Sequence, residues 1–138
     1  MQSRKKRKYA NKVARKKWES FLVTKKSDQL LTTTDRLIYI YIIDTKTNKT
    51  IEVVNVSYEI KIEKDWETII RFDSAHGYLH KHSRVSIVDK KETTTRDSVK
   101  QKGDPKRWLT WAIHDIQNNF IEYRRLFFKR SKLIDSFY

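Results

Sequence analysis

The chain has 138 residues, no cysteine, and 31 Lys and Arg against 17 Asp and Glu, so its net charge is +14. A chain of this length forms one domain that can bury a core without disulfides or a structural metal. The lack of cysteine excludes a disulfide framework, a thiolate metal site and a cysteine nucleophile. No apolar run approaches the roughly 18 residues of a membrane span, and the N-terminus lacks the apolar segment of a secretory signal. We therefore expect a cytoplasmic protein with no transmembrane segment.

The positive charge is concentrated at the N-terminus. Residues 1–26 hold eleven basic residues and one acid, for +10, whereas residues 27–138 carry +4. We predict a basic N-terminal helix or arm over residues 1–26, followed by a single α+β domain over residues 27–138. This asymmetry indicates a polyanionic partner: nucleic acid, an anionic membrane surface or an acidic protein.

The arm has the pattern of a basic helix over residues 3–26. Glycine and proline are absent, and Ala10, Ala14 and Trp18 fall on one side at helical spacing. One interpretation is a phosphate-binding arm that releases counterions from a nucleic acid, and the other is a solvated helix that aids solubility. The candidate nucleic-acid contacts of the arm are Arg4, Lys5, Lys6, Arg7, Lys8, Lys12, Arg15, Lys16 and Lys17.

The middle of the chain predicts a mainly antiparallel sheet of about four strands. Residues 27–35 are interpreted as a connector, and four later segments are rich in β-branched and aromatic residues. The short polar turns between them favour a meander. The second strand is long enough to bend or carry a bulge, and the first is apolar on both faces. The predicted strands are residues 36–44, 50–63, 66–73 and 84–89.

The last third of the chain predicts a loop and then a long helix. Residues 90–103 are polar and lack bulky apolar groups. Asp104 and Pro105 are an N-cap and a first helical residue, so a helix is expected to run to about Arg130. Its apolar stripe predicts packing across one face of the sheet. A second set of candidate nucleic-acid contacts lies near its end, namely Arg124, Arg125, Lys129 and Arg130.

Three of the four histidines follow the predicted third strand. His80 and His82 are two residues apart, so on a strand both side chains face the same way. The segment allows three interpretations. In metal-free RNA cleavage, histidines transfer protons while Arg71 stabilises charge. In a divalent-metal site, the ligands hold Zn²⁺, Mn²⁺ or Fe²⁺. In the third, the segment is a structural turn. The catalytic candidates are His76, His80, His82, Arg71 and Asp73, and the metal candidates are Asp73, His76, His80 and His82.

Residues 66–82, WETIIRFDSAHGYLHKH, resemble a signature of small uncharacterised archaeal and bacterial proteins, R-[YF]-D-[ST]-A-H-G-x-x-H. The wider pattern of strands and a C-terminal helix is more loosely similar to the TumE-like toxins of toxin–antitoxin pairs. The signature marks a set of characteristic positions and so implies the location of a site rather than its chemistry. The looser likeness implies a meander of strands joined to helices and a toxin-like activity. The characteristic positions are Arg71, Asp73, His76, Gly77, His80 and His82.

The leading interpretation is a nucleic-acid-binding protein, RNA favoured over DNA. A toxin-like, metal-independent ribonuclease activity that uses the histidines is a further hypothesis within it, and the sequence does not decide whether the protein is an enzyme. One alternative is a non-catalytic, basic module associated with nucleic acid or the ribosome, in which the histidine turn is structural. Another is a metal-dependent enzyme built on Asp73 and the histidines. Besides nucleic acid, the partner classes are an antitoxin-like protein and the ribosome. No cofactor is expected except in the metal-dependent alternative.

Overall fold

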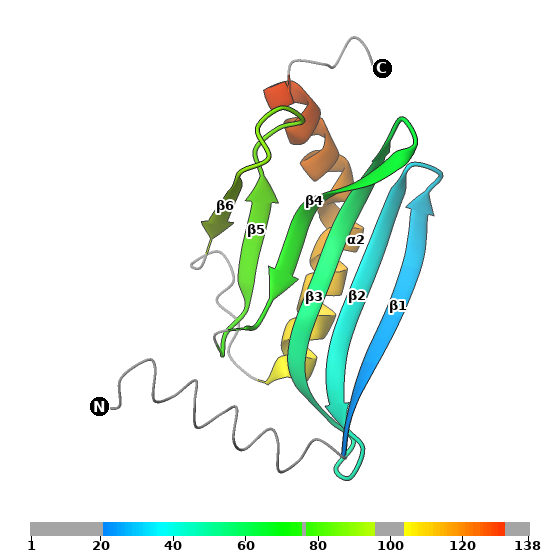
Figure 1. The fold of residues 1–138 in the computed structure, drawn as a ribbon, viewed down its shortest axis with the longest axis vertical. Helices are drawn as coiled ribbons and strands as arrows, with labels where there is room; N and C mark the ends of the chain where they lie inside the picture. Colours follow the sequence, from blue (N-terminus) through cyan, green and yellow to red (C-terminus); the bar gives the residue numbers. More distant parts are fainter. Residues whose placement is uncertain (1–20, 76, 96–103, 132–138) are drawn as a thin grey trace, which may run out of the picture.

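The computed structural model describes residues 21–75, 77–95 and 104–131. It consists of one antiparallel sheet, in which the six strands lie in chain order, and one helix that crosses a single face of that sheet (Figure 1). The α+β class and the meander are therefore confirmed. The elements are β1 (Leu22–Thr32), β2 (Asp35–Asp44), β3 (Lys49–Ile62), β4 (Asp65–Asp73), β5 (His80–Arg84), β6 (Glu92–Thr95) and α2 (Pro105–Ser131).

The helix α2 begins where the sequence predicts. The Arg107 amide donates a hydrogen bond of 3.0 Å to the Asp104 carboxylate, which is the N-cap contact expected of aspartate before proline. It ends at Ser131, one residue beyond the predicted end. Lys129 and Arg130 lie in its last turn, where positive charge complements the helix dipole. Within the described residues, no helix combines the length and apolar character needed to cross a membrane.

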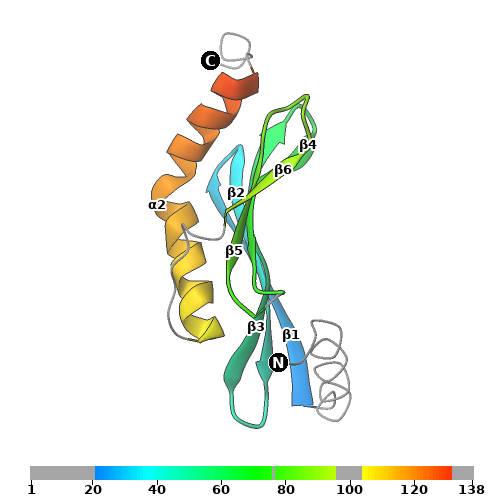
Figure 2. The same cartoon turned by 90° about the vertical axis from the view of Figure 1, so that its left-hand side faces the viewer.

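The hydrophobic core lies between α2 and the face of the sheet that it crosses (Figure 2). The Phe72 ring of β4 meets the Trp111 ring edge to face, with centroids 5.6 Å apart. The Tyr58 ring of β3 lies 5.9 Å from that of Phe120. These contacts confirm the predicted packing of the apolar stripe on the sheet, and they leave the opposite face of the sheet, which we call the open face, for other groups. The hydrophobic residues of the core with no exposed surface are Leu37, Val53, Val56, Tyr58, Phe72, Ala112, Ile116 and Phe127.

The N-terminal helix prediction is wrong for residues 22–26, and the connector prediction is wrong for residues 27–32 and for Asp35, between which residues 33–34 form a turn. Leu22 to Leu30 pair residue by residue with Asp44 to Arg36, so this segment is the edge strand β1. Most of its side chains are exposed, which explains why no apolar alternation indicates a strand there. The predicted boundary between residues 26 and 27 falls within β1, and residues 1–20 of the arm lie outside the described residues.

The described residues form six strands, not about four, and the strand expected at residues 84–89 is also placed wrongly. The strand β5 ends at Arg84, and the chain then turns, with the Ser86 amide bonded to the Asp89 carbonyl at 3.2 Å. Residues 92–95, which the sequence predicts to be part of a loop, form β6 and pair with β5. Polar threonines form this short edge strand because neither of its faces needs to enter the core.

Two of the bulges in the sheet set which side chains face the core. Ile40 of β2 pairs with Asn55 of β3, and the next residue, Tyr41, pairs with Val53. Val54 is therefore the extra residue of β3. Val53 is therefore fully buried whereas Val54 is 38% exposed. The predicted irregularity of this strand is confirmed. A second bulge at Ile69 of β4, which the alternating pattern did not indicate, lets Ile69 and Ile70 both be buried.

Candidate functional site

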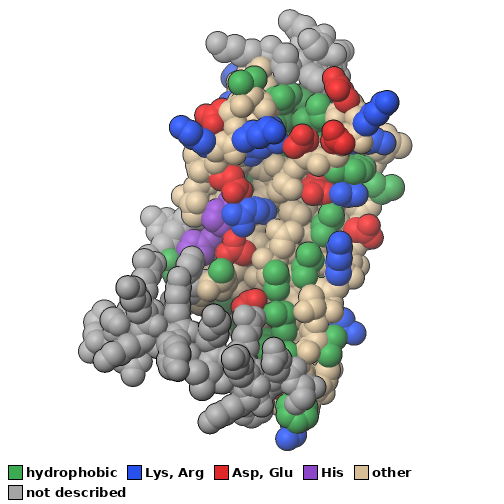
Figure 3. Space-filling view, in the orientation of Figure 1, with side chains coloured by type: hydrophobic (Ala, Val, Ile, Leu, Met, Phe, Trp, Pro, Cys, Tyr) green, Lys and Arg blue, Asp and Glu red, His purple; other side chains and the backbone are tan. Residues whose placement is uncertain are grey.

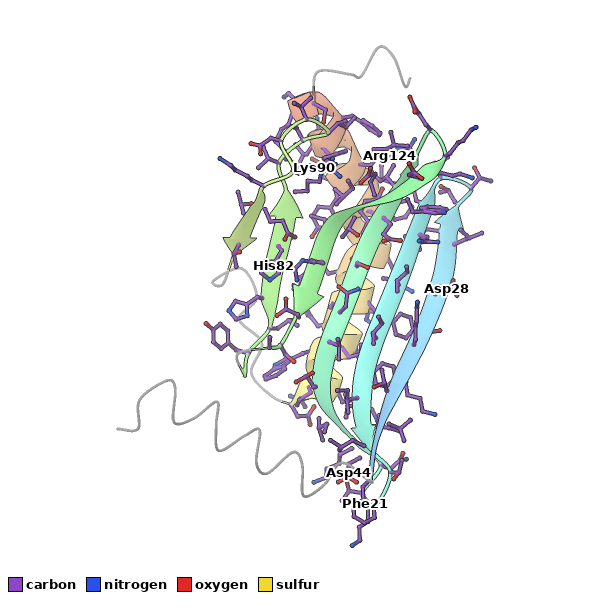
Figure 4. The ribbon with its side chains drawn as sticks, viewed as in Figure 1. Phe21, Asp28, Asp44, His82, Lys90 and Arg124 are labelled. Atoms are coloured by element: carbon purple, nitrogen blue, oxygen red, sulfur yellow. The ribbon has the colours of Figure 1, made fainter. Side chains whose placement is uncertain are left out.

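The polar groups of the histidine segment meet on the open face, across β4, β5 and β6. Ile70 and Phe72 of β4 enter the core, so the alternate residues Arg71 and Asp73 face away from α2. His82 of β5 is the register partner of Arg71, which places it beside them. Figure 3 shows histidine, basic and acidic side chains gathered on this face, and Figure 4 labels His82 there.

The Asp73 carboxylate joins the two neighbouring groups. Its Oδ2 atom accepts a hydrogen bond of 2.8 Å from Arg71 Nη1 and lies 3.0 Å from His82 Nε2. Its Oδ1 atom accepts the Ala75 amide at 3.2 Å, which fixes the carboxylate against the turn after β4. The other ring nitrogen of His82 lies 3.0 Å from the Thr94 hydroxyl. The imidazole is thus held from both sides in one orientation.

The Arg71 guanidinium is shared between two carboxylates. Its Nε and Nη2 atoms donate to the two oxygens of Glu92, at 2.9 and 3.1 Å, in a bidentate pair. The hydrogen bond that Arg71 donates to Glu92 is the main reason why the pKa of Arg71 is raised, and Asp73 adds to it. Two negative charges therefore surround one positive charge, and a phosphate that approached Arg71 would have to displace Glu92.

The three candidate histidines have different surroundings. His80 is buried, with 6% of its surface exposed, and its ring stacks 6.2 Å from that of His82, which confirms that the two share a face. The Tyr78 ring lies 4.0 Å from His80 on its other side. Gly77 has a φ of +85°, in keeping with the tight reversal that places β5 beside β4. His76 lies outside the described residues.

The metal alternative receives no geometric support from the described residues. Among them, no three His, Asp or Glu side chains converge where they could hold a metal ion. Asp73 and His82 form a pair but a metal site needs at least one more ligand from the protein. His76, the fourth candidate ligand, lies outside the described part of the chain, so metal binding stays a prediction.

The basic residues near the end of α2 do not form one free patch. Arg124 pairs with the buried Asp35 at 3.0 Å, on the core side of the sheet. Arg125 pairs with Glu122 at 2.7 Å on the exposed surface. Arg130 donates to the Val85 carbonyl at 2.7 Å. Lys129 is exposed. The candidate contacts of the arm, from Arg4 to Lys17, lie outside the described residues.

Sequence reasoning missed Glu92 and Thr94 as members of this site. Both lie in β6, within the segment that the sequence predicts to be a polar loop. The signal was present in the segment ETTT, because alternate residues of a strand share one face and three of the four residues are β-branched. A polar edge strand of this length gives too little hydrophobic contrast to be separated from a loop.

The structure defines a small α+β domain, with one helix on one face of a six-stranded meander and a histidine–aspartate–arginine network on the other. The chain belongs to the DUF7718 family, a domain of unknown function that matches residues 23–133. Searches of the curated proteins and of the solved structures found no match. These comparisons support neither the archaeal and bacterial signature nor the likeness to TumE-like toxins.

Proposed function

We propose that this protein binds nucleic acid, RNA in preference to DNA, through phosphate contacts made by its basic N-terminal segment. The observation that carries this proposal is the distribution of charge. The described residues hold eighteen basic and fourteen acidic residues, for a net charge of +4, whereas residues 1–20 hold nine basic residues and one acid. Such a segment releases counterions when it neutralises phosphates, which favours binding at low salt.

The ion pairs of the domain support the assignment of phosphate contacts to the N-terminal segment. Five arginines already donate to carboxylates within the domain, so their charge is largely neutralised, and Figure 3 shows basic and acidic side chains interspersed on the open face. Contacts with many phosphates therefore fall to the segment whose cations are not balanced by acids. The pairs are Arg36 with Glu59, Arg71 with Glu92, Arg84 with Glu67, Arg124 with Asp35 and Arg125 with Glu122.

The open face supports the proposed preference for RNA. Asp73, His82 and Thr94 together offer hydrogen-bond donors and acceptors of the kind that recognise a ribose 2′-hydroxyl. A deoxyribose strand lacks that group. We expect weaker binding of single-stranded DNA than of RNA with the same base sequence, and we expect Asp73→Asn to reduce the difference.

The test measures binding of single-stranded RNA by fluorescence anisotropy over a series of salt concentrations. One variant changes Arg4, Lys5, Lys6 and Arg7 to Gln. The matched control changes the same number of exposed lysines of the domain, Lys46, Lys49, Lys61 and Lys64, to Gln. Both remove four positive charges, and neither touches β1 from Leu22 onward.

If the arm contacts phosphates, the arm variant lowers the slope of log K against log salt by up to about 3, at about 0.7 per contact for single strands. The control lowers the slope much less. Equal slopes in the two variants would show that binding follows net charge alone and would refute a specific role for the arm.

A second candidate function, metal-independent RNA cleavage, is favoured by the contact between Asp73 and His82. The carboxylate orients the imidazole through Nε2, and Nδ1 is the ring atom that would meet a ribose 2′-hydroxyl in place of Thr94. Nδ1 would take the 2′-hydroxyl proton as the 2′-oxygen attacks phosphorus and the 5′-oxygen leaves with a proton from water. A single positioned base contributes about 10²–10⁴-fold to such a rate.

Cleavage of a mixed cellular RNA pool in EDTA tests this candidate. The variants are His82→Gln and, as a matched control, His114→Gln on the exposed surface of α2. Cleavage that persists in EDTA, is lost in the first variant and is kept in the second supports the candidate. Cleavage that EDTA abolishes would favour the metal alternative. Absence of cleavage by the unaltered protein, with and without EDTA, would refute both the metal-independent and the metal-dependent ribonuclease hypotheses. The proposal of RNA binding would be unaffected.

A further inference from the structure

A cavity of about 310 Å³ lies on the α2 side of the sheet, between the C-terminal half of the helix and strands β4, β5 and β6. It is separate from the Asp73–His82 pair, because Lys81 and Ser83 of β5 alternate with His82 and face the opposite side. Figure 1 shows β6 at the edge of the sheet, beside α2 and not covered by it. The volume is at the lower end of the range found for small-molecule sites.

The charged groups around this cavity all have one sign. Lys81, Arg84 and Arg130 line it together with the hydroxyls of Ser83 and Thr93, and no carboxylate of a described residue is among the lining groups. The Arg84 guanidinium is already bonded to Glu67 outside the cavity and to two backbone carbonyls. Lys81 and Arg130 remain as the charged donors.

Lys81 is held in the cavity wall by a phenol. Its Nζ atom donates a hydrogen bond of 2.9 Å to the Tyr123 hydroxyl, and that hydroxyl donates to the carboxylate of Asp115. Burial lowers the pKa of Lys81, and the more distant charge of Asp115 only partly opposes this effect. An anion beside Nζ would stabilise the ammonium form that burial disfavours.

Arg130 reaches the other side of the cavity from the last turn of α2. Its Nε atom donates to the Val85 carbonyl at 2.7 Å, which positions the guanidinium over the end of β5. Within the described residues, neither Arg130 nor Lys81 forms an ion pair with a carboxylate. Two cations that form no direct ion pair with a carboxylate of the described residues therefore line one concave site.

We propose that this cavity binds a small oxyanion of the phosphate class. The Lys81 ammonium and the Arg130 guanidinium are its charged donors, and the hydroxyls of Ser83 and Thr93 complete the set. Ile70 and Leu126 give the cavity an apolar wall, which suits a small organic group attached to the anion. This site does not depend on the proposed role of the N-terminal segment in RNA binding.

The test uses the full chain, labelled with ¹⁵N, and follows its amide resonances while inorganic phosphate is added at constant ionic strength with NaCl. We expect saturable shifts centred on Ser83, Thr93 and Tyr123. The variants Lys81→Met and Arg130→Gln each weaken this binding at least about tenfold, because each removes a charge-assisted hydrogen bond. The matched controls are Lys61→Met on β3 and Arg107→Gln on α2, both exposed, and they leave the affinity unchanged.

Two results would overturn the proposal. One is a set of shifts confined to residues away from the cavity, as for phosphate attracted only by the basic segment. The other is equal affinity in the unaltered protein and in both cavity variants, provided that their spectra show the native fold. A second arm compares 5′-phosphorylated with 5′-hydroxyl trinucleotides at the same resonances. If the 5′-phosphorylated trinucleotide binds more tightly than inorganic phosphate, the source of the anion is an RNA end. If the two bind equally, the source is the free anion.

Discussion

Replacing Asp35 by Ala is the sharpest test of how α2 is fastened to the sheet. Asp35 is the first residue of β2 and is fully buried. Its carboxylate accepts hydrogen bonds from the hydroxyls of Thr32 and Tyr58 and forms an ion pair with Arg124 of α2 at 3.0 Å. Figure 4 labels Arg124 where the helix passes behind the sheet. This one carboxylate therefore connects β1, β2, β3 and α2.

The magnitude follows from these contacts. Removing one partner of a buried ion pair costs about 3–5 kcal/mol. The Arg124 side chain is 26% exposed and retains some contact with water, so the lower end, about 3 kcal/mol, applies. Loss of the acceptor for the buried Tyr58 hydroxyl adds about 1 kcal/mol. We expect Asp35→Ala to lower the free energy of unfolding by about 4 kcal/mol, and Asp35→Asn, which keeps an acceptor oxygen, by about 2 kcal/mol.

Urea denaturation followed by tryptophan fluorescence measures these differences, from the midpoints at constant slope. The control is Asp28→Ala, since Asp28 is exposed on β1 and should change stability by less than about 0.5 kcal/mol. A loss smaller than about 1 kcal/mol for Asp35→Ala would refute the reasoning, because it would mean that the buried carboxylate contributes no more than a surface one.

Two further substitutions probe the ends of α2. Asp104→Ala removes the acceptor of the Arg107 amide and should cost about 1 kcal/mol, seen as a lower midpoint of thermal unfolding, and an unchanged midpoint would contradict the N-cap. Ser131→Ala removes a buried hydroxyl that accepts from the Ile87 amide at 2.9 Å and donates to the Phe127 carbonyl at 2.7 Å. Its cost should be about 1–3 kcal/mol in urea denaturation, and stability equal to that of the unaltered protein would rule out this contact as a link between the helix and the β5–β6 turn.

The parts of the fold that were predictable are those with strong local chemistry or strong hydrophobic contrast. The helix α2 has a capping aspartate, a first-turn proline and a continuous apolar stripe, so its start was predicted to the residue. The strands β3 and β4 bury one face against α2, and burial leaves an alternating pattern in the sequence. The strand β2 is recognisable instead from its continuous run of β-branched and aromatic residues. The edge strands β1 and β6 have no such pattern because solvent reaches most of their side chains.

The candidate site was predictable in its location but not in its connections. The spacing of His80 and His82 correctly placed both on one face of a strand. The spacing did not reveal that His80 is buried whereas His82 contacts Asp73. The burial of His80 depends on Tyr78 and on how the turn at Gly77 folds back. The neutralisation of Arg71 by Glu92 also lay beyond the sequence, since it requires the pairing of β6 with β5.

The order of the strands has a consequence for the synthesis of this chain. Each strand pairs with the one made just before it, so every hairpin can close as soon as its second strand leaves the ribosome. The helix that covers the core comes last, and until it arrives the sheet exposes an apolar face that includes Val56, Tyr58 and Phe72. A nascent chain halted before Pro105 would present that face to solvent and to other chains, and it would be prone to aggregate. Docking of the 27-residue helix α2 is therefore the event that protects the sheet from aggregation.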